Sequence, residues 1–89
     1  MTTRFFTPTI AQRTPFSFQT FSPNALARWL MDAHGFIEQM PTAGEVYRLH
    51  TEGMVVTIFR LGLILCEGRN ASASVLLLSD LCVEEGGDA

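Results

Sequence analysis

The sequence contains no lysine: all six basic residues in its 89 positions are arginines. A P-loop needs a lysine against the nucleotide phosphates, and Schiff-base chemistry needs a lysine amine. The absence of lysine therefore excludes both of these classes of enzyme.

Cysteine and histidine are also scarce, with two of each. Cys66, Cys82, His34 and His50 form no local pair such as CxxC or HxxxH, from which zinc sites are usually built. We therefore predict no metal, no cofactor and two reduced thiols. Cys66 as nucleophile, His50 as base and Asp80 as orienting group make one conceivable triad, but no motif positions them. The chain is accordingly predicted not to be an enzyme.

Long apolar segments are missing as well. The longest, Met54–Cys66, covers 13 positions and contains Arg60, whereas a membrane-spanning helix needs about 20 apolar residues. The first residues have no apolar core of the kind found in signal peptides. These features predict a soluble, cytoplasmic protein without a membrane partner.

Charge of the two signs is distributed unevenly along the chain. Residues 1–31 carry three arginines and no acid, whereas residues 32–89 carry all nine acids, and the net charge is −3. The length fits one domain over residues 1–89. The acidic tail, residues 84–89, is predicted to be flexible.

The N-terminal segment is rich in phenylalanine. Five of the seven phenylalanines lie in the first 21 residues. Because so many aromatic rings are not left in water, we predict that residues 1–20 form an extended arm that packs against a protein surface. Aromatic residues favour strands, and a short strand is expected near residues 15–20.

One helix is indicated clearly, over Pro23–His34. Ser22 is a typical N-cap, and proline is favoured at the first helical position. Phe21 and Leu26 have the spacing of a hydrophobic staple, and Gly35 is the expected C-terminal stop.

A sheet is predicted after residue 45. Residues 45–50 alternate in polarity, and residues 51–53 form a turn. Residues 54–60 are apolar on both alternating faces, which is typical of a central strand covered on both sides. Gly62 is either a bulge in one bent strand, which we favour, or the turn of a hairpin. The last strand is expected over Ala73–Leu78.

The predicted fold is α+β, with a small antiparallel sheet of three to five strands and one main helix packed on one face. Between Met54 and Val83, 19 of 30 residues are apolar, and one short helix covers only one face of such a sheet. The other face then needs the arm, a second copy of the chain or another protein.

This surplus of apolar residues predicts a non-catalytic protein-interaction module that forms a dimer or docks on a larger assembly. One specific form is a small acidic inhibitor or adaptor of the mobile-element type, whose carboxylates occupy a basic nucleic-acid groove. The predicted protein-binding residues are Glu45, Glu52, Glu67, Phe5 and Phe6.

The alternative is a single-stranded nucleic-acid binder that uses the N-terminal arm. Such proteins combine phosphate attraction by arginine with base stacking on aromatic rings. The residues that would bind nucleic acid are Arg4, Arg13, Phe16 and Phe18.

Overall fold

A computed structural model describes residues 10–82, so the predictions for the first nine residues and for the tail 84–89 lie outside the described residues. The described residues form, in chain order, β1 (Ile10–Thr14), β2 (Ser17–Thr20), α1 (Pro23–His34), β3 (Ile37–Gln39), β4 (Glu45–Thr51), β5 (Met54–Phe59), β6 (Leu63–Glu67) and α2 (Ala71–Ser79). The predicted α+β class is confirmed. The predicted three to five strands and single main helix are wrong in number, because residues 10–82 contain six strands and two helices.

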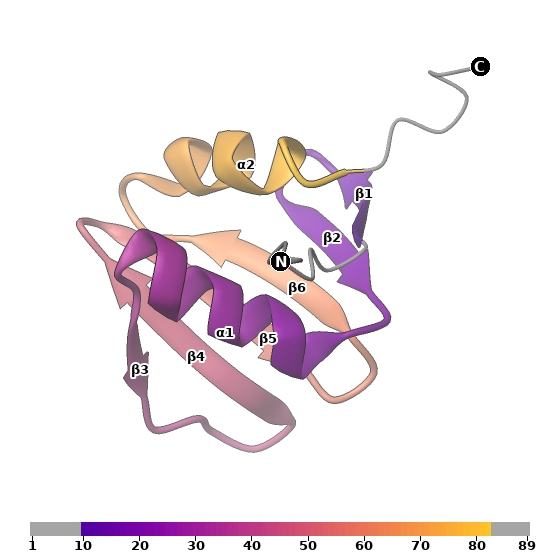
Figure 1. The fold of residues 1–89 in the computed structure, drawn as a ribbon, viewed down its shortest axis with the longest axis vertical. Coiled ribbons are helices and arrows are strands. Elements are labelled where there is room, and N and C mark those ends of the chain that lie inside the picture. Colours follow the sequence, from indigo (N-terminus) through magenta and orange to yellow (C-terminus); the bar gives the residue numbers. More distant parts are fainter. Residues whose placement is uncertain (1–9, 83–89) are drawn as a thin grey trace, which may run out of the picture.

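The six strands form one antiparallel sheet in the order β1-β2-β6-β5-β4-β3 (Figure 1). Four of the five pairings join strands that follow each other in sequence, as short hairpins do. The fifth pairing, β2 with β6, attaches the N-terminal hairpin to the remainder, with Phe18 opposite Ile64. What was predicted as an extended arm is therefore, from residue 10 onward, the β1–β2 hairpin at one edge of the sheet.

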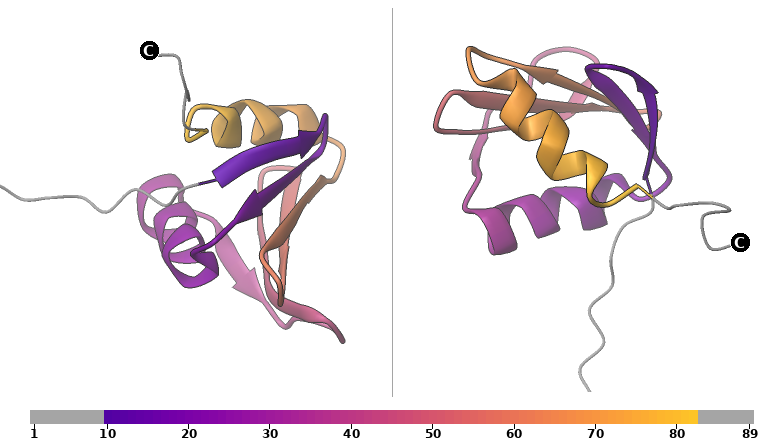
Figure 2. Two further views of the ribbon diagram at one scale, coloured as in Figure 1. Left: turned by 90° about the vertical axis from the view of Figure 1, so that its right-hand side faces the viewer. Right: turned by 90° about the horizontal axis from the view of Figure 1, so that it is seen from above.

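Both helices lie on the same side of the sheet (Figure 2). α1 contacts β4, whereas α2 contacts β5 and β6. α1 connects β2 to β3, the strand at the far edge, so it has to cross the sheet. The two helices together cover one face, and within residues 10–82 no helix covers the other.

The structure confirms the predicted helix Pro23–His34. Gly35 ends it with φ +70°, a left-handed conformation that glycine adopts without steric cost. The predicted details of its start are wrong. The Ser22 side chain makes no capping hydrogen bond with a described residue. Phe21 is 86% exposed and therefore does not act as a staple on the buried Leu26.

The strand predicted over Ala73–Leu78 is wrong, because these residues belong to helix α2. The buried residues of α2 are Ser74 and Leu78, four positions apart on one helical face. Leu76 lies between them in sequence and is 70% exposed. An exposed leucine inside an apolar run hides the helical period, which is why the sequence resembled a buried strand.

Gly62 belongs to the turn of a hairpin and not to one bent strand, because β5 and β6 pair antiparallel on either side of it. Its φ is +90°, and its N–H donates to the carbonyl of Phe59 at 2.8 Å. Its own carbonyl accepts a 2.9 Å bond from the Thr20 N–H. A Cβ at Gly62 would overlap the Thr20 carbonyl oxygen. Only glycine allows the turn to approach β2 this closely.

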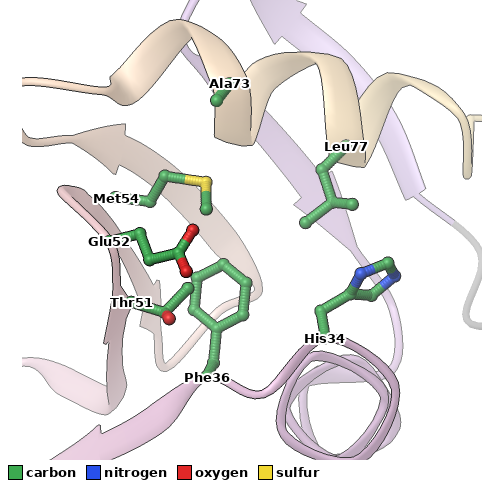
Figure 3. Close-up of a pocket in the computed structure, with 7 residues that line it drawn as sticks. All are labelled: His34, Phe36, Thr51, Glu52, Met54, Ala73 and Leu77. Carbon is green, nitrogen blue, oxygen red and sulfur yellow. The ribbon is translucent and has the colours of Figure 1, made fainter.

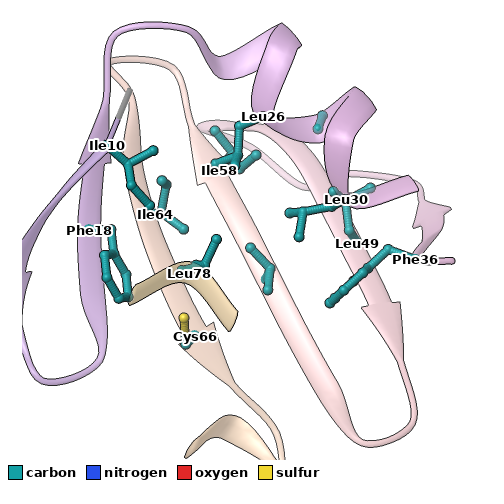
Figure 4. Packing of buried hydrophobic residues seen from close by; sticks show 12 residues of the cluster. Ile10, Phe18, Leu26, Leu30, Phe36, Leu49, Ile58, Ile64, Cys66 and Leu78 are labelled. Atoms are coloured by element: carbon teal, nitrogen blue, oxygen red, sulfur yellow. The ribbon is translucent and has the colours of Figure 1, made fainter. Parts of the chain in front are cut away.

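The core lies between the helices and the covered face of the sheet (Figure 4). Phe18 on β2 is fully buried, and so is Leu78 on α2. The buried apolar residues come from both helices, from five strands and from the connection between α1 and β3: Ile10, Phe18, Leu26, Ala27, Leu30, Phe36, Leu49, Val56, Ile58, Ile64, Cys66 and Leu78. Because Ile10 also bridges to Cys82, the first and last described residues are tied to the same core.

Substitution of Gly62 by alanine should destabilise the protein by about 3 kcal/mol or more, since it adds backbone strain and a steric overlap. Gly44→Ala is the matched control: Gly44 has φ +86°, but a Cβ there would meet no described atom within 4 Å. The control should lose only about 1–2 kcal/mol for its left-handed backbone. Urea unfolding of both variants measures the difference, and equal losses would contradict the close approach of the turn to β2.

Candidate protein-interaction surface

The face of the sheet opposite the two helices is the candidate surface and is called the open face below. Side chains alternate between the two faces along a strand. On β5, Val56 and Ile58 enter the core, so Val55, Thr57 and Phe59 project from the open face. The same alternation places Leu63 and Leu65 of β6 there, since Ile64 and Cys66 are buried on the helix side.

The centre of the open face is apolar. Leu65 lies opposite Thr57 in the register of β6 and β5, and Leu63 and Phe59 flank the turn between these strands. We define the apolar centre as four half-buried residues, Val55, Phe59, Leu63 and Leu65. They are adjacent on the two middle strands of the sheet, so they form one continuous patch.

Polar and charged side chains border the apolar centre on both flanks. On the β4 flank, Arg48 lies opposite Thr57, and its Nε is 3.4 Å from a carboxylate oxygen of Glu45. On the β1 flank, Arg13 donates to Gln19 Oε1 at 3.3 Å. An apolar centre inside a polar rim is the usual anatomy of a protein–protein interface.

The apolar surface continues to one end of the sheet, where two large side chains are exposed. Phe21 and Leu61 are each 86% exposed. Thr20, next to Phe21, donates its N–H to Gly62, next to Leu61, and Gln19 Nε2 donates to the Leu61 carbonyl at 2.7 Å. Both exposed residues therefore lie where the β5–β6 turn meets the end of β2.

Thr57 occupies the middle of the open face and is 1% exposed. Its hydroxyl oxygen is buried and has no hydrogen-bond partner among the described residues. Such a hydroxyl costs about 1–3 kcal/mol of stability when it stays unsatisfied. Neighbouring side chains of the open face thus already exclude water from its centre.

The three predicted acidic residues do not form one surface. Glu45 is at the start of β4, and Glu52 is in the turn after the other end of that strand. Glu67 is exposed at the end of β6, near this turn, because it lies opposite Val55. The hydrogen bond from the Thr42 backbone N–H and the nearby Arg48 guanidinium lower the pKa of Glu45. Glu45 is therefore engaged within its own chain, and only Glu52 and Glu67 lie at a common end.

The predicted arm residues are separated by the structure. Arg4, Phe5 and Phe6 lie outside the described residues. Arg13 and Phe16 belong to the exposed part of the β1–β2 hairpin, where Phe16 is 50% exposed. Phe18 is fully buried in the core, so its ring offers no surface on which a base can stack.

The conceivable triad is not assembled. Cys66 is on the helix side of the sheet, where it lies opposite Val56, whereas His50 lies opposite Val55 and projects from the open face. The sheet therefore separates nucleophile and base. Within residues 10–82, no three His, Cys, Asp or Glu side chains are grouped as metal ligands.

Two cavities flank the β4–β5 turn, one on each side of the sheet. The one on the open face has a volume of about 440 Å³ and is lined by Gln39, His50, Gly53, Met54, Val55, Gly68 and Arg69. The one on the helix side, called the interhelix pocket below, has a volume of about 260 Å³ and is lined by His34, Phe36, Thr51, Glu52, Met54, Ala73 and Leu77 (Figure 3). Glu52 is thus the predicted acid that faces a cavity.

The sequence did not identify the residues of the open face individually. It indicated an apolar surplus over residues 54–83, which the structure divides mainly among β5, β6 and α2. Period-two alternation cannot say which face of the sheet the helices cover. The sequence predicted that Phe21 packs on Leu26 as a hydrophobic staple. Phe21 is instead exposed, because it lies in the connection between β2 and α1 at the end of the sheet.

The Cys66 thiol should react slowly with thiol reagents. Burial raises its pKa, with a smaller opposing effect of a hydrogen bond to Ser74, so little of the reactive thiolate is present at pH 8. We expect labelling at least about tenfold slower in the native protein than in denaturant, and a rate that rises with pH. Half-buried Cys82 is the internal control. Equal rates for native and denatured Cys66, followed by mass spectrometry of the labelled peptides, would contradict its place in the core.

None of the described helices is long and apolar enough to cross a membrane. Comparison with protein-family models, with curated proteins and with solved structures gave no match. The function of the chain therefore has to be inferred from its surfaces.

Proposed function

We propose that the chain is a non-catalytic protein-interaction module whose open face packs on the open face of a second copy. The observation that carries this proposal is the placement of both helices on one face of the sheet, which leaves the apolar centre without a helix over it in residues 10–82. Contiguous apolar side chains on a protein surface, bordered by polar residues, are typical of a binding site.

A second copy fits this face for a geometric reason. Two antiparallel sheets pack face to face about 10 Å apart, with inward side chains of each sheet forming a shared core. A two-fold axis through the open face would set the two apolar centres against each other, as in isologous dimers. Val55, Phe59, Leu63 and Leu65 would then form the middle of the interface.

The charges of the rim are compatible with self-association. Arg13, Arg48 and Arg69 supply three positive charges, and Glu45 and Glu67 supply two negative ones, so the rim carries only a small positive excess. Arg48 and Glu45 already form an ion pair within one chain. Contact of this face with its own copy therefore does not force a large excess of like charges together.

The acidic inhibitor or adaptor remains a finer version of the proposal. In a dimer formed through the open faces, the helices and Glu52 stay on the outside, where a basic partner can reach them. Carboxylates on such a surface speed association with a positively charged groove.

Binding of single-stranded nucleic acid is the second candidate function. Exposed Arg13 and Phe16 on the same hairpin support it, and it predicts affinity that falls steeply with salt. Phe18 does not contribute to it because the ring is buried.

Sedimentation at micromolar concentration should give twice the mass of a single chain. Leu63→Gln combined with Leu65→Gln should produce a monomer, because two polar amides would be buried without partners in the interface. Both positions are half-buried on the open face, so the variant should keep its secondary structure by circular dichroism.

Leu76→Gln is the matched control, because Leu76 is 70% exposed on α2, on the other side of the sheet. This variant should sediment as the dimer. A monomeric wild-type chain, or a paired Leu63 and Leu65 variant that remains dimeric, would refute packing through the open face. A salt-sensitive complex with single-stranded DNA that is lost in Arg13→Ala would favour the second candidate.

A further inference from the structure

We infer that the interhelix pocket binds an arginine side chain of a protein partner. This goes beyond dimerisation through the open face, because the pocket lies on the helix side of the sheet and stays accessible in such a dimer. Its walls come from three parts of the chain: the end of α1 with Phe36, the β4–β5 turn, and α2.

The pocket combines one carboxylate with apolar walls. Figure 3 shows the Glu52 carboxylate directed toward the ring of Phe36, with Met54 on the same side and Leu77 across the space. Glu52 has no hydrogen bond or ion pair of its side chain with the described residues. A cation on an apolar stem fits this arrangement, because the stem packs on the walls while the head group meets the carboxylate.

The end of α1 and the start of α2 both lie at the pocket, and their partial charges have opposite signs. α1 has 12 residues and ends at His34, which lines the pocket. The C-terminal end of a helix carries the equivalent of about half a negative charge, and its effect is confined to the last turn. α2 begins at Ala71, and its first turn contributes Ala73 to the same pocket. The positive end of α2 offsets the negative end of α1, so the Glu52 carboxylate supplies the net attraction for a cation.

Guanidinium fits the pocket better than other cations of the same charge. It is planar, it can donate two parallel hydrogen bonds to one carboxylate, and it stacks on aromatic rings. The exposed ring of His34 can provide such a surface, whereas Phe36 is 4% exposed and contributes only part of the apolar wall. The volume of about 260 Å³ is below the 300–1,000 Å³ that is typical of drug-sized ligands, which favours a single side chain.

The backbone of Glu52 has an unusual conformation for a residue other than glycine. Its φ is +44°, and it is the one non-glycine residue with positive φ among the described residues. Asparagine or glycine fits this turn position with less strain. The turn is fixed in place by the Asn70 N–H, which donates to the Gly53 carbonyl at 2.9 Å. Arg69 lines the cavity on the other side of Gly53, so the chain's own guanidinium does not line the interhelix pocket.

The test is a titration of the full chain with N-acetyl-arginine amide, followed by NMR chemical shifts. The matched probe is N-acetyl-citrulline amide, which has nearly the same shape but carries no charge. The arginine probe should shift the resonances of Glu52, Phe36 and Leu77 in a saturable way. The citrulline probe should bind about tenfold more weakly, since charge-assisted hydrogen bonds are lost. The fluorescence of Trp29, whose ring centroid lies 4.4 Å from that of His34, provides a second readout.

Glu52→Gln should weaken binding of the arginine probe about tenfold, and Glu67→Gln should leave it unchanged. Glu52→Asn removes the same charge and suits the left-handed turn, so it should lose binding without loss of folding. Equal binding of the two probes, shifts that map elsewhere, or full binding by both Glu52 variants would overturn the inference. Because the probes are small molecules, this outcome does not depend on whether the chain dimerises.

Discussion

A β-sheet has two faces, and each apolar face needs a cover. In this chain the covering elements are on one side: α1 crosses from β2 to the far-edge strand β3, and α2 returns over β5 and β6. The pairing of β2 with β6 makes this arrangement possible, because it places the N-terminal hairpin beside the last strand. The glycine at position 62 allows the close contact on which this pairing depends.

One-sided covering divides the molecule into two surfaces of different chemistry. The open face has an apolar centre and a rim with side chains of both charge signs, which suits contact with an identical face. The helix side carries the interhelix pocket with Glu52, which suits a basic side chain of a different protein. A dimer through the open face would present two such pockets on its outer surfaces. Two linked sites raise the avidity for a partner with repeated arginines when geometry allows both to be occupied.

Local signals in the sequence predicted the parts of the fold that depend on local interactions. Pro23 and Gly35 mark helix α1 by their backbone preferences, and they do so whatever packs around the helix. α2 was missed because exposed Leu76 disrupts the helical pattern, and this exposure depends on tertiary packing. Of the candidate site, the sequence predicted an apolar surplus and Glu52, but the face and the pocket arise from strand order, which no local pattern encodes.

The most direct measurement of the central claim is the solvent accessibility of methyl groups, probed by NMR with a soluble paramagnetic agent at several protein concentrations. Methyls of Val55, Leu63 and Leu65 should be shielded at high concentration and become accessible on dilution, as the dimer dissociates. The Leu76 methyls should be accessible throughout. Open-face methyls that are equally accessible at every concentration would contradict the account, because the apolar centre would then have no second copy over it.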